Sequence, residues 1–587
     1  MRSARTSGDR DPTRFDSAWT VGLAAVFLLV LVAWRSTLGM SLFDDGFYAA
    51  ATLRLAQGAR LFVDEMFVQS TGFLVAVPFA RAWTMLFGTA GFVVALRLFY
   101  VALAGAVALV VYRVFRPSFG RWAAFGGAAV PLLAPPFNLL AVSYNTMAAL
   151  GLILALALSF RALRDTDCRA AAAAGVAAAF ASISYPPLAI VAVAMLCSLA
   201  FLGRDRRLTT AMVAGACGAV VVFGVWLFAV EGVSIADLRL TYDYVMRAYS
   251  SAGSGVRMSY QVGRLWELLT RHWAPALLAW FVPVISIALG VAFAAVRFPE
   301  REELRGRMAF LIPVALAIPI LVNVFGPGRD GGLWTVGGNY IAALVLFALP
   351  GLVVSARGGS SDMRRLLILA LPAGAIGFVI VSATTSASVY WASGVVGLAP
   401  LGAAAVVWLV SEVRRSSHPR LDLYATLMLT LSFAMLLFGA SFRDGPPLAL
   451  RHTIVAGPYA GVTTTDASAA VLSGFDRLAA RWVGPTTGVL VLSAPGPYVV
   501  LGGVMVTNAV WPYLGPADTA TIDYFERVGR WPDVVFLPSW MLSDSGAPIG
   551  SSKADPLVVE IAARYRVVER SAATGFTVLT GAPEGPP

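Results

Sequence analysis

The sequence predicts a mainly α-helical protein, a polytopic transmembrane helical bundle of about thirteen spans followed by a smaller α/β domain. Of its 587 residues, 58% are hydrophobic and only 13% are charged, whereas soluble domains carry about 25% charged residues. Apolar runs that approach the roughly 20 residues needed to cross a bilayer recur as far as residue 440. From residue 441 onward the composition is that of a soluble domain. Together these observations exclude an ordinary soluble protein, whose surface would need far more polar residues.

The first span is expected at 19–38. The preceding tail, 1–18, is charged and no small-residue cleavage site follows the apolar run, so we expect a retained span and not a signal peptide. A shorter apolar stretch at 73–87 contains Arg81, which favours a re-entrant or interfacial helix. The other spans are expected at 89–112, 121–137, 144–161, 169–184, 187–202, 208–230, 273–296, 308–325, 338–356, 365–382, 393–411 and 421–440.

Arginine gathers on one side of this array. Each short loop on the side of the N-terminal tail carries three or four arginines, whereas the short loops on the other side contain Arg329 alone. The positive-inside rule therefore predicts a multi-pass plasma (inner) membrane protein with a cytoplasmic N-terminus and an extracytoplasmic C-terminal domain. The same rule accounts for the formal charge of +11 without a nucleic-acid partner. The Ala, Gly and Arg bias, with Lys553 as the single lysine, indicates a high-GC genome.

Three long segments are expected outside. The loop 39–88 is polar and acidic, and the loop 231–272 alternates aromatic and basic residues as an interfacial amphipathic helix does. The third segment, 441–587, is expected to fold as the α/β domain. Its strands are expected at 489–492, 534–537, 565–568 and 576–579, and its helices at 518–529 and 556–564. The cysteines Cys168, Cys197 and Cys217 show no metal-binding spacing and no disulfide framework.

The first outside loop contains two acidic pairs. Asp44 and Asp45 follow the first span directly, and Gly46 and Tyr48 continue into a predicted short helix. Asp64 and Glu65 follow one short helix later. Carboxylates at the headgroup level are unfavourable unless they face a wet cavity, pair with cations or serve a function. The structural alternative is a helix N-cap with solvated loop charges.

The order of span, acidic pair, aromatic residue, short helix ending in Gly, second acidic position and apolar stretch ending L-F-G resembles the GT-C superfamily. These multi-spanning glycosyltransferases use polyprenyl-phosphate sugars; they include protein mannosyltransferases, aminoarabinose transferases and actinobacterial arabinofuranosyltransferases. The resemblance implies that Asp44 is the catalytic base, with Asp45 beside it. Asp64 and Glu65 match the family's second acidic position less closely and are candidate substrate-binding residues.

The resemblance implies an inverting displacement, which moves a sugar from a polyprenyl phosphate to a cell-envelope glycan, glycolipid or protein. A carboxylate then removes the acceptor proton, and cations neutralise the leaving phosphate. Candidate cations lie in the second outside loop, although arginines there also contact anionic lipid in ordinary interfacial helices. Arg329 lies in a Gly-rich loop that is either a phosphate clamp or a connector. The loop candidates are Arg247, Arg257, Arg264, Arg271 and His272.

Ser143, Tyr144 and Asn145 form a polar triplet at the outer end of a predicted span. They either line the substrate cavity, with Tyr48, or simply cap the helix through Ser143. Paired carboxylates beside a phosphate also suit Mg²⁺, Mn²⁺ or Ca²⁺, and superfamily members differ in metal use, so the sequence leaves a divalent cation undecided.

Two other classes of function remain open at this point. A transporter or lipid-linked-sugar flippase would carry charged residues in mid-span, and Arg97 is an exception to the otherwise uncharged spans. A non-catalytic envelope-assembly protein would use its C-terminal domain to bind partners.

Overall fold

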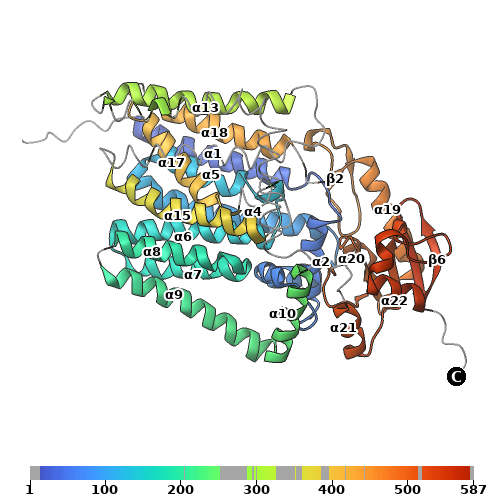
Figure 1. Cartoon of the computed structure of the whole chain (residues 1–587). Coiled ribbons are helices and arrows are strands. Elements are labelled where there is room, and N and C mark those ends of the chain that lie inside the picture. The colour runs from blue at the N-terminus through green and yellow to red at the C-terminus, as the bar shows by residue number, and fades with distance from the viewer. Residues whose placement is uncertain are drawn as a thin grey trace, which may run out of the picture.

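The computed structural model confirms a mainly helical fold with a small C-terminal sheet domain (Figure 1). It describes residues 13–203, 205–250, 301–325, 360–384, 396–416, 418, 420–439, 441, 443–512, 514 and 519–581, with a few single positions between 263 and 298 and at 351. The predicted spans 273–296 and 338–356 lie largely outside these residues, so the total of thirteen spans stays a prediction.

The helices of the first 440 residues form the larger body, with α13 at its upper edge and α9 at its lower edge in Figure 1. Within the described residues, six helical segments are long and apolar enough to cross a membrane. The helices of this body are α1 (Thr13–Arg35), α2 (Asp44–Ala56), α3 (Val77–Phe87), α4 (Phe92–Phe119), α5 (Arg121–Leu133), α6 (Tyr144–Asp165), α7 (Cys168–Ser184), α8 (Ala189–Leu202), α9 (Arg206–Val225), α10 (Ile235–Ser250), α13 (Glu302–Phe325), α15 (Ser361–Thr384), α17 (Ala399–Val413) and α18 (Leu421–Gly439).

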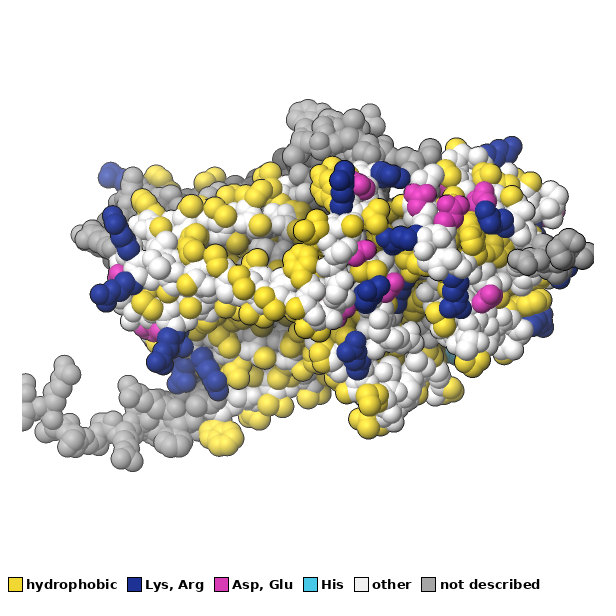
Figure 2. Space-filling model, turned by 90° about the horizontal axis from the view of Figure 1, so that it is seen from below, with side chains coloured by type: hydrophobic (Ala, Val, Ile, Leu, Met, Phe, Trp, Pro, Cys, Tyr) yellow, Lys and Arg dark blue, Asp and Glu magenta, His cyan; other side chains and the backbone are white. Residues whose placement is uncertain are grey.

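The distribution of charge fits a membrane-embedded body. Figure 2 shows apolar and uncharged atoms across the middle of one face, with arginines gathered at one end and mixed charges at the other. Along α9, only 6% of the most apolar 18-residue window is buried inside the protein. Because exposed apolar surface of this extent is unfavourable in water, such faces are suited to contact with lipid.

Small residues set the close packing of α7 against α9. A Cβ on Gly175 would overlap the backbone of Met212, and one on Gly215 would overlap the backbone of Ala172. Glycine allows two helices to approach until their backbones touch, which is a common way to associate membrane helices.

The stretch predicted as a short apolar helix at 73–87 is longer in the structure. A 3₁₀ segment, η1 (Val68–Ala76), leads directly into α3, and together they span 20 residues with enough apolar character to cross a membrane. The Thr71 hydroxyl donates to the carbonyl of Ile183 at 2.6 Å, and Gly72 packs against the backbone of Tyr144. The sequence pattern misses η1 because these nonlocal contacts, and not hydrophobic periodicity, fix its helical form.

The C-terminal domain is built on a five-stranded sheet of order β4-β3-β5-β7-β6. Strand β3 pairs in parallel with β4 and β5, whereas β7 is antiparallel to β5 and β6. The four predicted strands occur as β3 (Gly488–Val491), β5 (Val534–Pro538), β6 (Tyr565–Ser571) and β7 (Phe576–Gly581), and the structure adds the short β4 (Val504–Met505). The helices are α19 (Asp466–Trp482), α20 (Pro497–Leu501), α21 (Ala520–Val528) and α22 (Pro556–Arg564).

A short hairpin joins the two parts of the chain. Strands β1 (His452–Thr453) and β2 (Thr463–Thr464) are antiparallel, and Thr463 also bridges to Leu38, just after α1. The amide of Gly39 donates to the Thr463 carbonyl at 2.8 Å, and Gly39 has a φ of +87°, a conformation that glycine adopts readily. The turn that precedes α2 is therefore tied to the C-terminal segment.

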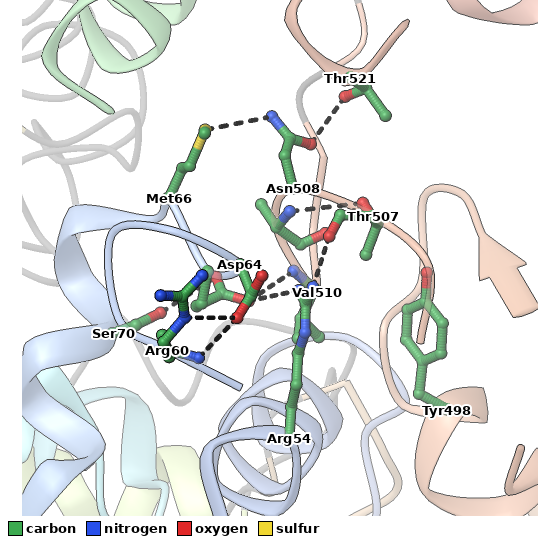
Figure 3. A network of polar contacts seen from close by, with 12 residues as sticks. Arg54, Arg60, Asp64, Met66, Ser70, Tyr498, Thr507, Asn508, Val510 and Thr521 are labelled. Carbon is green, nitrogen blue, oxygen red and sulfur yellow. Dashed lines mark hydrogen bonds and ion pairs between the residues drawn. The ribbon is translucent and has the colours of Figure 1, made fainter. Parts of the chain in front are cut away.

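A buried ion pair forms a second connection between the two parts (Figure 3). The guanidinium of Arg54 contacts the Glu65 carboxylate at 2.8 Å and also donates to the Thr507 carbonyl. Glu65 accepts from the Val510 amide at 3.0 Å and from the Ser70 hydroxyl at 3.2 Å. Because the side chains of Arg54 and Glu65 are 5% and 0% exposed, neither charge can be left unpaired without a large cost.

We therefore expect Arg54→Met to destabilise the protein by about 3–5 kcal/mol, because it leaves the Glu65 carboxylate buried without its cation. Thermal unfolding of the detergent-purified chain checks this. The matched control is Arg307→Gln, since Arg307 pairs with Glu303 at the surface and exposed pairs contribute little. Equal, small effects of the two variants would contradict a clamping role for the buried pair.

Candidate functional site

The two neighbouring acids at the start of α2 have different environments. Asp45 is buried, and its carboxylate contacts the Arg97 guanidinium at 2.6 Å and 3.4 Å through two separate nitrogens. Arg97 projects from α4 and also donates to the carbonyls of Ser36 and Gly39, both at 2.8 Å. Asp45 therefore fixes the chain between α1 and α2 onto α4 and is already occupied by a protein cation.

Asp44, in contrast, keeps a carboxylate oxygen without a hydrogen-bond partner. Its Oδ2 atom is buried and receives no hydrogen bond from the described residues. The nearest ion-pair contact of this atom is the Arg443 Nε at 3.9 Å, and the Arg443 guanidinium also lies 4.4 Å from the centre of the Phe43 ring. Burial raises the pKa of the Asp44 carboxyl above its ordinary value, although Arg443 opposes this shift. A carboxylate of this kind is suited to accept a proton.

The segment that carries Asp44 is held in place from the C-terminal side. The Gly496 amide donates to the Leu42 carbonyl at 2.7 Å, and the Met40 amide donates to Asp444 at 2.7 Å. A Cβ on Gly46 would overlap the backbone of Gly496, so both glycines allow this close approach. The C-terminal domain thus sets the position of the first turn of α2.

Aromatic and polar side chains gather beside Asp44. Tyr48 lies one turn further along α2, and its ring centre is 6.3 Å from that of Tyr144 at the start of α6. Burial, and the proximity of Tyr144 and Asp44, raise the pKa of the Tyr48 hydroxyl, which therefore stays protonated. The buried Nδ2 atom of Asn145 also has no hydrogen-bond partner among the described residues. The structure thus brings together four of the predicted site residues, Asp44, Tyr48, Tyr144 and Asn145.

Ser143 has the capping role that the sequence offered as an alternative. Its hydroxyl accepts from the Thr146 amide at 3.1 Å, and the Thr146 hydroxyl accepts from the Ser143 amide at 2.9 Å. This capping box fixes the start of α6, so that Tyr144 and Asn145 occupy its first turn. Capping is therefore the role of Ser143, and the lining of a substrate cavity by Tyr144 and Asn145 stays a prediction.

An aromatic and hydroxyl network extends the site toward α15. The Tyr144 ring centre lies 5.7 Å from that of Tyr185, and the Tyr185 hydroxyl is 2.8 Å from the Thr384 hydroxyl. Tyr185 stands between α7 and α8, and it is almost fully buried.

The second acidic pair has contacts that argue against a role in binding substrate. Both oxygens of Glu65 are bound by Arg54, Ser70 and Val510. Asp64 accepts from the Arg60 amide at 2.8 Å in a turn and has a partly exposed side chain. The observed partners of Asp64 and Glu65 thus lie within the protein, and their contact with substrate stays a prediction.

The expected phosphate-binding cations are mostly beyond what the structure describes. Arg257, Arg264, Arg271, His272 and Arg329 lie outside the described residues. Arg247 lies on α10 and is about half exposed. Its guanidinium contacts the C-terminal domain at Asp523, at 3.9 Å, and at the Thr519 hydroxyl, at 3.4 Å.

Sequence reasoning missed the roles of Arg97 and Arg443. Arg97 could have been recognised as the partner of an acid, because a charged residue in an apolar span needs an opposite charge. Arg443 gives no such signal, since it follows the last predicted span in a polar stretch.

The described residues do not provide a ready metal site. Among them, no three His, Cys, Asp or Glu side chains gather closely enough to hold a metal ion. Asp45, the natural partner of Asp44 in such a site, is engaged by Arg97. Among the described residues, the surroundings of Asp44 therefore do not fit a bound divalent cation.

A family model described as dolichyl-phosphate-mannose-protein mannosyltransferase matches residues 74–228. This match confirms the resemblance to GT-C glycosyltransferases that the sequence predicts, and it supports a membrane-embedded transferase. The matched stretch begins after α2, so it does not include Asp44. No curated protein matches the chain.

Two solved structures show similarity over most of the chain. The oligosaccharyltransferase AglB from Archaeoglobus fulgidus, in complex with an inhibitory peptide and a dolichol-phosphate, is 13% identical with a TM-score of 0.44, over 97% of this chain and 75% of AglB. ArnT from Cupriavidus metallidurans in the apo state is 16% identical with a TM-score of 0.44, over 97% of this chain and 100% of ArnT. At these scores the likenesses say nothing about individual residues.

The contrast between the two acids predicts opposite effects on stability. Asp45→Asn should destabilise the protein by about 3–5 kcal/mol, because it leaves Arg97 buried without its anion. Asp44→Asn should stabilise it at neutral pH, because the folded state disfavours the Asp44 carboxylate. For a group whose folded pKa is raised, the folded state binds protons more tightly, so wild-type stability falls as pH rises through that folded pKa.

Unfolding of both variants and of the wild type, measured across pH, checks this prediction. The advantage of Asp44→Asn over the wild type should disappear below the ordinary Asp pKa of 3.8. If Asp44→Asn were less stable than the wild type and Asp45→Asn were equally stable, the roles assigned to the two acids would be reversed.

Proposed function

We propose that this chain is an integral-membrane glycosyltransferase that moves a sugar from a polyprenyl-phosphate donor to a hydroxyl group of a cell-envelope glycan, glycolipid or protein. The observation that carries the proposal is the buried Asp44 oxygen that no described residue hydrogen-bonds, next to an Asp45 that Arg97 holds. The family match over residues 74–228 supports the transferase class.

In the proposed reaction Asp44 is the general base. The acceptor oxygen attacks the anomeric carbon while its proton passes to Asp44, and the bond from that carbon to the phosphate oxygen breaks with its electron pair leaving on phosphate. One displacement of this kind inverts the anomeric centre. The carboxylate also stabilises the positive charge that develops on the sugar ring in an oxocarbenium-like transition state.

The neighbouring side chains have chemistry that suits a sugar. The protonated Tyr48 hydroxyl and the Asn145 amide can donate hydrogen bonds to sugar oxygens, and the Tyr144 ring offers an apolar face beside them. Arg443 is 44% exposed and lies at the edge of Asp44, so its guanidinium can approach a leaving phosphate. Arg97 cannot take this role, because Asp45 and two carbonyls enclose it.

The membrane arrangement completes the proposal. The segment 19–440 forms the membrane domain, with 1–18 cytoplasmic and 441–587 outside. Asp44 then lies at the outer rim of the bilayer, where a lipid-linked donor and an envelope acceptor can both reach it. The contacts of Gly496 with Leu42 and Gly46 indicate that the C-terminal domain supports the base.

The proposal predicts that Asp44→Asn lowers the rate of transfer by about 10²–10⁴-fold, because general-base catalysis contributes that much. The assay uses membranes that contain the full chain, supplied with polyprenyl-phosphate-linked mannose, arabinose or aminoarabinose. Envelope glycans of a deletion strain, analysed by mass spectrometry, identify the sugar to use. The control is Asp466→Asn, which removes an exposed carboxylate from the C-terminal domain. Undiminished transfer by folded Asp44→Asn would remove Asp44 as the base.

A pH profile tests the same residue independently. Since burial raises the Asp44 pKa, kcat/KM should fall on acidification at a pH clearly above 3.8, the ordinary value for aspartate. Asp44→Glu should keep partial activity, because glutamate preserves the carboxylate base. The acidic limb of its pH profile should differ from that of the wild type, because the longer side chain shifts the position of the carboxylate. An acidic limb that is identical in wild type and Asp44→Glu would assign the titration to another group.

A further inference from the structure

A cavity lies far from Asp44, where the C-terminal ends of α4 and α17 meet the start of α15. Its volume is about 270 Å³, and its polar lining includes the side chains of Ser118, Ser360, Trp408, Ser411, Arg414 and Arg415. The C-terminal end of α4 bears Ser118, whereas Arg97 of the same helix contacts Asp45. With 21 residues between them and a rise of about 1.5 Å per residue, the two positions are roughly 30 Å apart. The cavity is thus separate from the proposed transfer site.

Two hydrogen-bond donors at this cavity are buried. Among the described residues, none bonds the Trp408 Nε1 or the Ser411 Oγ. Trp408 is 1% exposed. Buried polar groups are nearly always paired in native proteins, and exceptions mark missing water, ions or ligands. A cavity of this size holds far more than one water molecule, which occupies about 30 Å³ of liquid.

The position of these groups is fixed by their surroundings. Gly351 leaves no room for a Cβ against the Trp408 indole, so the ring is held from one side. Glu412 lies 3.3 Å from Arg305 and 3.2 Å from Arg415, and Arg415 also contacts Glu302 at 3.1 Å. Arg414 reaches the Phe119 carbonyl through one nitrogen at 3.4 Å, which leaves its other N–H groups for a ligand.

The chemistry of the lining favours an anion with several oxygens. An indole N–H and a guanidinium can only donate hydrogen bonds, and serine hydroxyls readily do so. Donors without a described partner therefore outnumber such acceptors, and Arg414 adds positive charge at the wall. Arginine and hydroxyl donors suit a phosphoryl group, whose oxygens are strong acceptors. Arg415 and Glu412 are already in ion pairs, Arg415 with Glu302 and Glu412, and Glu412 also with Arg305.

We propose that this cavity binds a phosphoryl group, for which glycerol phosphate is a simple probe. Trp408 and Ser411 bond the phosphoryl oxygens, and Arg414 neutralises part of their charge. The same chemistry occurs in a phosphatidylglycerol headgroup and in a free phosphate ester. This site does not depend on the proposed transfer reaction.

The test uses the full-length chain in two forms. In detergent, isothermal calorimetry measures binding of sn-glycerol 3-phosphate. In nanodiscs that contain phosphatidylcholine with or without phosphatidylglycerol, native mass spectrometry counts retained lipid. Binding in the first form identifies a soluble phosphate ester, and selective retention of phosphatidylglycerol alone identifies a lipid headgroup. Absence of both would overturn the proposal.

Variants of the lining residues locate the binding. Trp408→Phe keeps the ring and removes the N–H, and we expect roughly 10-fold weaker binding, as for loss of one charge-assisted hydrogen bond. Arg414→Gln should weaken binding by a similar or larger factor. Arg307→Gln removes an exposed arginine of α13 that does not line the cavity, and Asp44→Asn alters the distant site, so both should bind as the wild type does. Equal affinity of Trp408→Phe, Arg414→Gln and wild type would exclude this cavity as the site.

Discussion

The buried ion pair between Arg97 and Asp45 is the constraint on which the rest of the candidate site depends. The side chains of Arg97 and Asp45 are 7% and 2% exposed. Arg97 also donates hydrogen bonds to the carbonyls of Ser36 and Gly39. A pair this deep adds little net stability compared with an apolar equivalent, but it is costly to break on one side. Its main consequence is geometrical, since it fixes where α2 begins relative to α4.

This constraint gives two adjacent aspartates different chemistry. The Asp45 carboxylate is paired with Arg97. Asp44, one residue earlier, lies beside Tyr48 and the start of α6, and one of its oxygens receives no hydrogen bond from the described residues. The C-terminal domain adds a second constraint through Gly496, Asp444 and the Arg54–Glu65 clamp. The C-terminal domain, which in the sequence simply follows the last predicted span, therefore helps to position the proposed base.

Local patterns in the sequence predict much of this fold. Apolar runs locate most helices of the membrane body, and alternating β-rich segments locate β3, β5, β6 and β7. The acidic pair and the Tyr144–Asn145 dipeptide point to side chains that meet in space. The sequence does not reveal which acid is engaged, because Arg97 is 52 residues from Asp45 and their pairing leaves no local signal. For the same reason it gives no sign of the partners of Glu65, which include Val510 at a separation of 445 residues.

The central claim is that Asp45 serves only to pair with Arg97, while Asp44 acts on the substrate. The most direct measurement is the transfer rate of the double variant Asp45→Asn/Arg97→Gln, which removes both charges together and keeps two amides in their place. If the account is correct, the purified and folded double variant retains transfer within about tenfold of wild type, as removal of both partners avoids an unpaired buried charge. If the folded double variant instead loses transfer completely, Asp45 takes part in the chemistry and the assignment of roles to the two acids is wrong.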